Sequence, residues 1–162
     1  MGSAGRVARM ADAHQPDTIH VDEIGIGAGV LDRLRERGLR ASGINVGEAA
    51  FDKEHYANRR SEIFWDLRER FRTGDISIPK DDSLLMAQLV ALKFTYTSRG
   101  QIKLESKEDM AKRRGTSQGW ASPDRADALA IAFAAGRPFA LPAGSSGPSK
   151  GRTDSPLREA LR

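Results

Sequence analysis

Three aspartates in this chain have the residue type and the spacing that metal-assisted phosphodiester chemistry uses. Asp22 comes at the end of an apolar strand predicted over residues 18–24, directly before a glycine-rich turn. Asp124 and Asp127 stand one helical turn apart at the start of an apolar helix. Carboxylates that a strand end and a helix start deliver to one cleft can hold divalent metal ions. These spacings predict a metal site built from both segments.

Each aspartate also has a purely structural explanation. Asp22 could cap the turn that follows it, and Asp124 could complement the dipole of its helix as an acid in the first turn. This explanation fits Asp127 less well, because Asp127 lies among Ala, Leu, Ile and Phe, where an unpaired charge is costly. The glycine turn could also suggest a dinucleotide site, but GIGAGV at 25–30 lacks the third glycine of G-x-G-x-x-G. The sequence therefore favours metal binding.

Basic side chains near the aspartates could contact DNA phosphates. The predicted phosphate contacts are Arg59, Arg60, Lys112, Arg113 and Arg114, with Lys107 in the same basic segment as the last three. This segment, over 105–115, ends a few residues before Asp124. The alternative is a solvated helix face with an ion pair between Glu108 and Lys112.

Composition excludes several classes of site. The 162 residues contain no cysteine, so disulfides and thiolate metal sites are excluded, and the three histidines, at 14, 20 and 55, lack zinc spacing. The net charge is +4, but residues 136–162 carry much of the basic excess, so the charge of the whole chain says little about a DNA-binding face. No apolar run is long enough for a membrane span, and no signal peptide opens the sequence. We expect a soluble, intracellular protein.

Periodicity predicts an α/β domain over 1–135. Residues 18–46 read as a strand–helix–strand unit, which usually has parallel strands and a right-handed crossover. The remaining predicted elements are helices over 4–14, 53–72, 81–92 and 106–115, a hairpin over 94–104, and a final buried helix capped by Ser122. Residues 136–162 are rich in Pro, Gly and Ser, which predicts a flexible tail.

Four blocks of the chain together resemble the nuclease domain of phage large terminase subunits. They are VDEIGIGAGVLDRL at 21–34, YANRRSE at 56–62, LESKEDM at 104–110 and SPDRADAL at 122–129. The blocks run in the family's order with similar spacing, and the resemblance covers roughly residues 5–135.

The resemblance implies an RNase H-like fold and an endonuclease that cuts concatemeric viral DNA during packaging. Two Mg²⁺ or Mn²⁺ ions would flank the scissile phosphate. By this likeness Asp22 and Asp124 are metal ligands, and Asp127 is either a further ligand or an acid that contacts a metal ligand. Lys107 stabilises charge at the phosphate. The implied partners are double-stranded DNA, the terminase ATPase domain, the small terminase subunit and the portal protein. The implied location is the host cytoplasm, transiently at the procapsid.

The sequence departs from the family pattern in two respects. The first three strands of the sheet, with the catalytic aspartate of the first, have no counterpart before residue 18. The Walker A motif G-x-x-x-x-G-K-[ST] of the ATPase half is absent as well. We therefore expect an N-terminally truncated nuclease domain. The alternative is a catalytically incomplete fragment that acts only as a DNA-binding or interaction module, or a prophage remnant.

Overall fold

The computed structural model describes residues 2–114 and 122–134. The elements are α1 Ser3–His14, β1 Ile19–Asp22, α2 Gly27–Glu36, β2 Ala41–Ile44, α3 Arg59–Thr73, α4 Ser83–Ala91, β3 Phe94–Tyr96, β4 Ile102–Leu104, α5 Lys107–Arg114 and α6 Asp124–Phe133. Within the described residues no helix is long and apolar enough to cross a membrane. The predicted tail over 136–162 lies outside the described residues.

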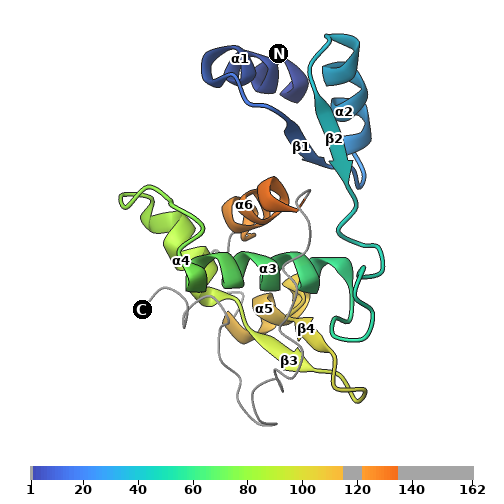
Figure 1. Cartoon of the computed structure of the whole chain (residues 1–162), viewed down its shortest axis with the longest axis vertical. Helices are drawn as coiled ribbons and strands as arrows, with labels where there is room; N and C mark the ends of the chain where they lie inside the picture. The colour runs from blue at the N-terminus through green and yellow to red at the C-terminus, as the bar shows by residue number, and fades with distance from the viewer. Residues whose placement is uncertain (1, 115–121, 135–162) are drawn as a thin grey trace.

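The N-terminal part is the predicted parallel unit, and that prediction is confirmed. Strands β1 and β2 pair in parallel, with Ile19 opposite Ala41 and Asp22 opposite Ile44. Helix α2 packs on both strands and α1 packs on α2. Helix α6 lies between this unit and α3 (Figure 1), so the residues at the end of β1 meet the C-terminal part of the chain.

Helix α3 forms the centre of the core. Its buried Ile63, Phe64 and Leu67 belong to one apolar cluster with residues of α4 and α6, among them Leu89 and Ala130. A second cluster on another side of α3 joins Tyr56, Trp65, Phe94 and Ile102. Burying both faces of one helix fixes the position of every residue on it, including those that point toward β1.

The predicted helix over 53–72 begins later than expected, at Arg59. Asn58 has an extended backbone, and its side chain accepts the Ser61 amide at 2.9 Å, so it caps the helix. The preceding residues form turns instead, because Asp52 Oδ1 accepts the amides of Glu54 and His55 at 3.2 and 3.1 Å. Periodicity alone did not reveal this side-chain cap.

The hairpin prediction is confirmed, because β3 and β4 pair antiparallel with Phe94 opposite Leu104. Within the described residues the strands form two sheets of two strands each. The Ser106 hydroxyl accepts the Asp109 amide at 3.0 Å, which caps the start of α5.

Two expectations for α6 were wrong. Pro123, not Ser122, occupies the N-cap position of α6. The side chain of this N-cap residue accepts no hydrogen bond from the amides of the first turn. The helix is also amphipathic rather than wholly buried: Ala126, Ala130 and Ile131 are buried, whereas Ala128 and Ala132 are exposed. Small alanine side chains are compatible with either environment, so composition could not decide which face is covered.

Candidate active site

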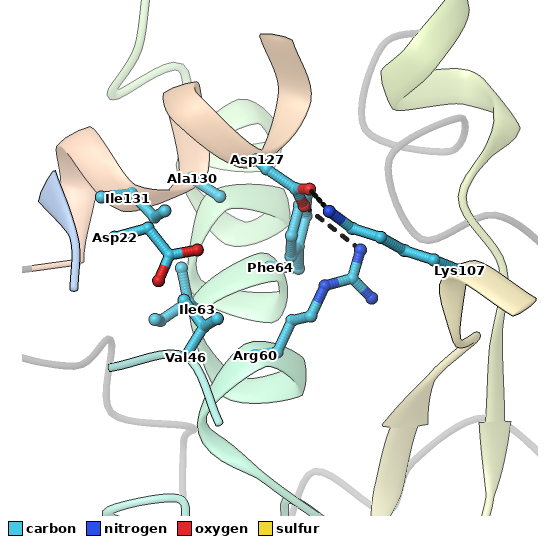
Figure 2. Close-up of a pocket in the computed structure, with 9 residues that line it drawn as sticks. All are labelled: Asp22, Val46, Arg60, Ile63, Phe64, Lys107, Asp127, Ala130 and Ile131. Atoms are coloured by element: carbon cyan, nitrogen blue, oxygen red, sulfur yellow. Dashed lines mark hydrogen bonds and ion pairs between the residues drawn. The ribbon is translucent and has the colours of Figure 1, made fainter. Parts of the chain in front are cut away.

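A pocket of about 80 Å³ lies where the end of β1, helix α3, the start of α5 and helix α6 meet. Its lining residues are Asp22, Val46, Arg60, Ile63, Phe64, Lys107, Asp127, Ala130 and Ile131. Figure 2 shows the Asp22 and Asp127 carboxylates entering this space from two different elements. Residues more than a hundred positions apart in the sequence thus share one small pocket, whose lining combines charged side chains with apolar ones.

Asp127 forms ion pairs with both cations that line the pocket. Its Oδ2 lies 2.8 Å from Lys107 Nζ, and its Oδ1 accepts from Arg60 Nη2 at 3.2 Å (Figure 2). Arg60 also donates from Nη1 to the Glu105 carbonyl at 3.0 Å. The charge expected to be costly in an apolar helix is therefore paired with two cations.

Asp22 is more open than Asp127. It is exposed, and its Oδ1 accepts the Ile24 amide at 3.2 Å. The structural explanation and the functional one both fit, because one carboxylate oxygen closes the turn while the side chain lines the pocket. Among the described residues the Asp22 carboxylate takes part in no ion pair, so it can accept a ligand without breaking one.

Gly27 sets the position of the Asp22 backbone. A Cβ atom at residue 27 would lie 1.6 Å from the carbonyl oxygen of Asp22, a distance no side chain tolerates. Helix α2 therefore starts directly against the end of β1, and only a glycine permits this approach.

We expect Gly27→Ala to destabilise the fold by roughly 1–3 kcal/mol, at the upper end of the range for overpacking, because the clash is with backbone. It should also displace Asp22. Gly29→Ala is the matched control, since nothing lies within 4 Å of a Cβ there, and alanine should stabilise the helix slightly. Thermal unfolding of both variants checks the prediction, and equal melting temperatures would contradict it.

Asp124 is placed differently from the other two aspartates. It is the first residue of α6, is exposed, and is not among the residues that line the pocket. Its role as a metal ligand stays a prediction.

The next residue, Arg125, makes an ion pair with both carboxylate oxygens of Asp82, each at 2.8 Å. The pKa of Asp82 lies below its ordinary value, because its carboxylate accepts the Leu85 amide and pairs with Arg125.

The predicted phosphate contacts fall into different environments. Arg59 is buried in an ion pair with Glu62, and Arg113 donates to Glu105 at 2.7 Å. Lys112 is exposed, with Asp109 4.0 Å away. The side chain of Arg114 lies outside the described part of the chain. Of the four whose side chains the structure describes, only Arg60 lines the pocket.

Arg59 and Glu62 form a buried hydrogen-bond network next to the site, on the helix that carries Arg60. Glu62 is fully buried, and its Oε2 accepts Arg59 Nη1 at 2.6 Å and the Phe51 amide at 3.0 Å. Its Oε1 accepts the Asp52 amide at 2.9 Å, and Arg59 Nη2 donates to the Ala134 carbonyl at 2.9 Å. One ion pair thus connects α3, the loop before it and the end of α6.

The donor set fits one hard divalent cation more readily than two. Aspartate oxygens suit Mg²⁺ or Mn²⁺, and two aspartates line the pocket. Within residues 2–114 and 122–134, however, no group of three or more His, Cys, Asp or Glu side chains could hold a metal ion. The two-metal site that the resemblance implied stays a prediction.

Comparison with solved structures decides the fold. The nuclease domain of the large terminase subunit of bacterial virus Sf6 superimposes with a TM-score of 0.60 at 21% identity, covering 79% of this chain and 69% of that one. The chain has the fold of a large-terminase nuclease domain. A lysine-to-alanine variant of the Sf6 domain with manganese and β-thujaplicinol gives 0.60 at 20% identity, over 79% and 69% of the two chains. The same variant with manganese gives 0.58 at 20% identity, over 79% and 70%.

The terminase nuclease fold confirms the predicted class, an RNase H-like α/β fold with a partial sheet. No protein-family model matches the sequence, and no match was found among curated proteins. Three residues that the sequence analysis singled out, Asp22 and Asp127 by type and spacing and Lys107 by the resemblance, line this one pocket, and their catalytic roles stay predictions. Sequence reasoning missed the side chain that caps α6, Gln88, because nothing local distinguishes this glutamine from a surface residue.

Proposed function

We propose that this chain is a metal-dependent DNA endonuclease domain of the large-terminase type, which cuts concatemeric viral DNA during genome packaging. One observation carries the proposal: Asp22 and Asp127 line one pocket together with Lys107, in a chain with the terminase nuclease fold. Two acids and a cation around one small space match the needs of phosphodiester cleavage. Such cleavage needs carboxylates to hold the metal ion and positive charge to offset the negative charge of the phosphate.

Asp22 and Asp127 would hold the divalent ion, Mg²⁺ or Mn²⁺. When bound, such an ion polarises the phosphate and lowers the pKa of a water molecule. Manganese in the Sf6 structures supports this choice of metal. Lys107 is half exposed at the pocket, so its ammonium can reach a phosphate oxygen while it remains near Asp127. Arg60 is more enclosed and keeps Asp127 in place.

The partners proposed for this domain are double-stranded DNA as substrate, the terminase ATPase domain, the small terminase subunit and the portal protein. The proposed setting is the host cytoplasm and the procapsid. Asp124, the first residue of α6, is proposed as an additional metal ligand. Lys112, Arg113 and Arg114 are proposed as contacts to the DNA backbone beyond the pocket.

A second function is favoured by a specific observation. The described residues supply only two pocket carboxylates, and Asp127 is already neutralised by Arg60 and Lys107. A chain with this site could bind DNA without cutting it. It would then be an incomplete nuclease that serves as a DNA-binding or interaction module, or a prophage remnant.

Plasmid nicking by the purified chain distinguishes these functions. We expect the chain to convert supercoiled DNA to nicked circles in Mn²⁺ and to lose this activity in EDTA, with DNA binding followed in parallel by gel shift. A folded chain that binds DNA but never cuts it would establish the second function. A folded chain that neither binds nor cuts DNA would contradict both the nuclease and the DNA-binding module.

A further inference from the structure

Helix α6 carries Asp127, yet its own sequence provides no side-chain cap for its first turn. The first amides of a helix have no partner within the helix, so they need an acceptor from elsewhere. The Gln88 side chain of α4 supplies it: Oε1 accepts the Arg125 amide at 3.0 Å and the Ala126 amide at 3.1 Å. The cap of α6 therefore comes from another helix.

The same side chain also holds the residue before the helix. Gln88 Nε2 donates to the Ser122 carbonyl at 3.3 Å. One amide group thus makes three hydrogen bonds to the backbone at 122, 125 and 126. An amide that both donates and accepts can fix the rotation and the height of a helix start, which a single bond cannot.

A second contact between the same helices strengthens this connection. Asp82 caps α4 by accepting the Leu85 amide at 3.0 Å, and it also pairs with Arg125 of α6. Behind them, Leu85 and Leu89 of α4 belong to the same buried cluster as Ala126 and Ala130 of α6. The starts of α4 and α6 are therefore joined by polar contacts at the surface and by apolar packing beneath.

We propose that Gln88 is a positioning residue for the candidate active site, holding the first turn of α6 so that Asp127 reaches Arg60 and Lys107. The inference rests on the proposed function for its catalytic consequence. Asp127 follows directly after the two capped residues, so a rotation of this turn moves its carboxylate. The pairs at 2.8 and 3.2 Å tolerate little displacement.

The test compares Gln88→Met with Gln88→Glu. Methionine keeps the volume and removes all three hydrogen bonds, whereas glutamate keeps an acceptor for the Arg125 and Ala126 amides. Gln101→Met is the matched control, because Gln101 also donates to a backbone carbonyl, that of Lys53 at 2.7 Å, but lies in the β3–β4 hairpin. All three variants keep the apolar core, so each can be examined as a folded protein.

Two NMR measurements report on the positioning without requiring cleavage. In Gln88→Met we expect hydrogen exchange at the Arg125 and Ala126 amides to accelerate about fivefold or more, as loss of a hydrogen-bonded cap implies. We also expect the Arg60 Nη–H signals, which report its pairing with Asp127, to broaden. In Gln88→Glu and in Gln101→Met we expect the amide exchange rates and the Arg60 signals to stay close to those of the parent chain.

Cleavage supplies the catalytic readout. In Gln88→Met the Mn²⁺ concentration for half-maximal nicking should rise several-fold, with Gln88→Glu close to the parent chain. Unchanged Arg60 signals in Gln88→Met would overturn the inference, whether or not the amides exchange faster. If the parent chain does not cut DNA at all, the proposed function fails, while the Arg60 signals still decide whether Gln88 positions Asp127.

Discussion

Replacing Asp127 by asparagine should reduce Mn²⁺-dependent nicking by about a hundredfold or more, the scale on which a group that stabilises charge in a transition state acts. Asparagine has the same shape but cannot carry the negative charge that holds a divalent ion. The change also leaves the Arg60 and Lys107 charges without their counter-ion. Affinity for DNA should therefore stay equal or increase, because the pocket becomes more positive.

This opposite effect on cleavage and binding separates a lost metal ligand from a misfolded protein. Asp22→Asn provides a second variant with little risk to the fold, since Asp22 is exposed and makes one hydrogen bond to a backbone amide. It should lower nicking to a similar degree. Asp124→Asn tests the remaining aspartate of α6, which does not line the pocket, and should have a smaller effect. Full nicking by Asp127→Asn with normal metal dependence would rule out the proposed site.

Replacing Glu62 by glutamine should destabilise the protein by about 3–5 kcal/mol, the usual cost of removing one partner from a buried ion pair. Glu62 is fully buried and accepts hydrogen bonds from Arg59 and from two loop amides. In the variant an amide NH₂ would face one of these donors, and the Arg59 charge would remain buried without compensation. Urea unfolding of Glu62→Gln measures the change in the free energy of unfolding.

The exposed pair Arg33–Glu36 is the matched control for Glu62. It has a similar spacing and a distance of 2.7 Å, but the Glu36 side chain is 61% exposed, so Glu36→Gln should change stability by less than about 1 kcal/mol. The double variant Arg59→Met/Glu62→Gln should be less destabilised than the two single changes added together, because no lone charge is left. Equal unfolding curves for Glu36→Gln and Glu62→Gln would contradict the buried-pair account.

Much of the fold was predictable because its causes are local. Alternating and helical apolar patterns, with a glycine turn between them, gave the parallel unit of β1, α2 and β2 and the β3–β4 hairpin. The start of α3 was misplaced because Asn58 and Asp52 hold the preceding residues in turns through side-chain hydrogen bonds. Such bonds compete with helical ones, and periodicity contains no information about them.

In the candidate site, too, some features were predictable from the sequence and others were not. Residue type and spacing singled out Asp22 and Asp127 as candidates, because a charge at a strand end or inside an apolar helix must be accounted for, whereas Lys107 was proposed from the resemblance. Sequence could not separate Arg59 from its neighbour Arg60: one is buried against Glu62 and the other reaches Asp127. Adjacent residues on a helix point about 100° apart, so only the packing around α3 decides which partner each arginine meets.

By itself the sequence determined the type and order of most helices and strands, since apolar periodicity and turn residues act over short range, although it misplaced the start of α3 and the cap of α6. It also singled out the carboxylates proposed to hold a metal. The tertiary structure alone decided which charges meet. Asp127 with Lys107 and Arg60, and Gln88 with the start of α6, are contacts between residues far apart along the chain. Their geometry depends on how α3, α4 and α6 pack, and close packing of the core, rather than local preference, sets those distances.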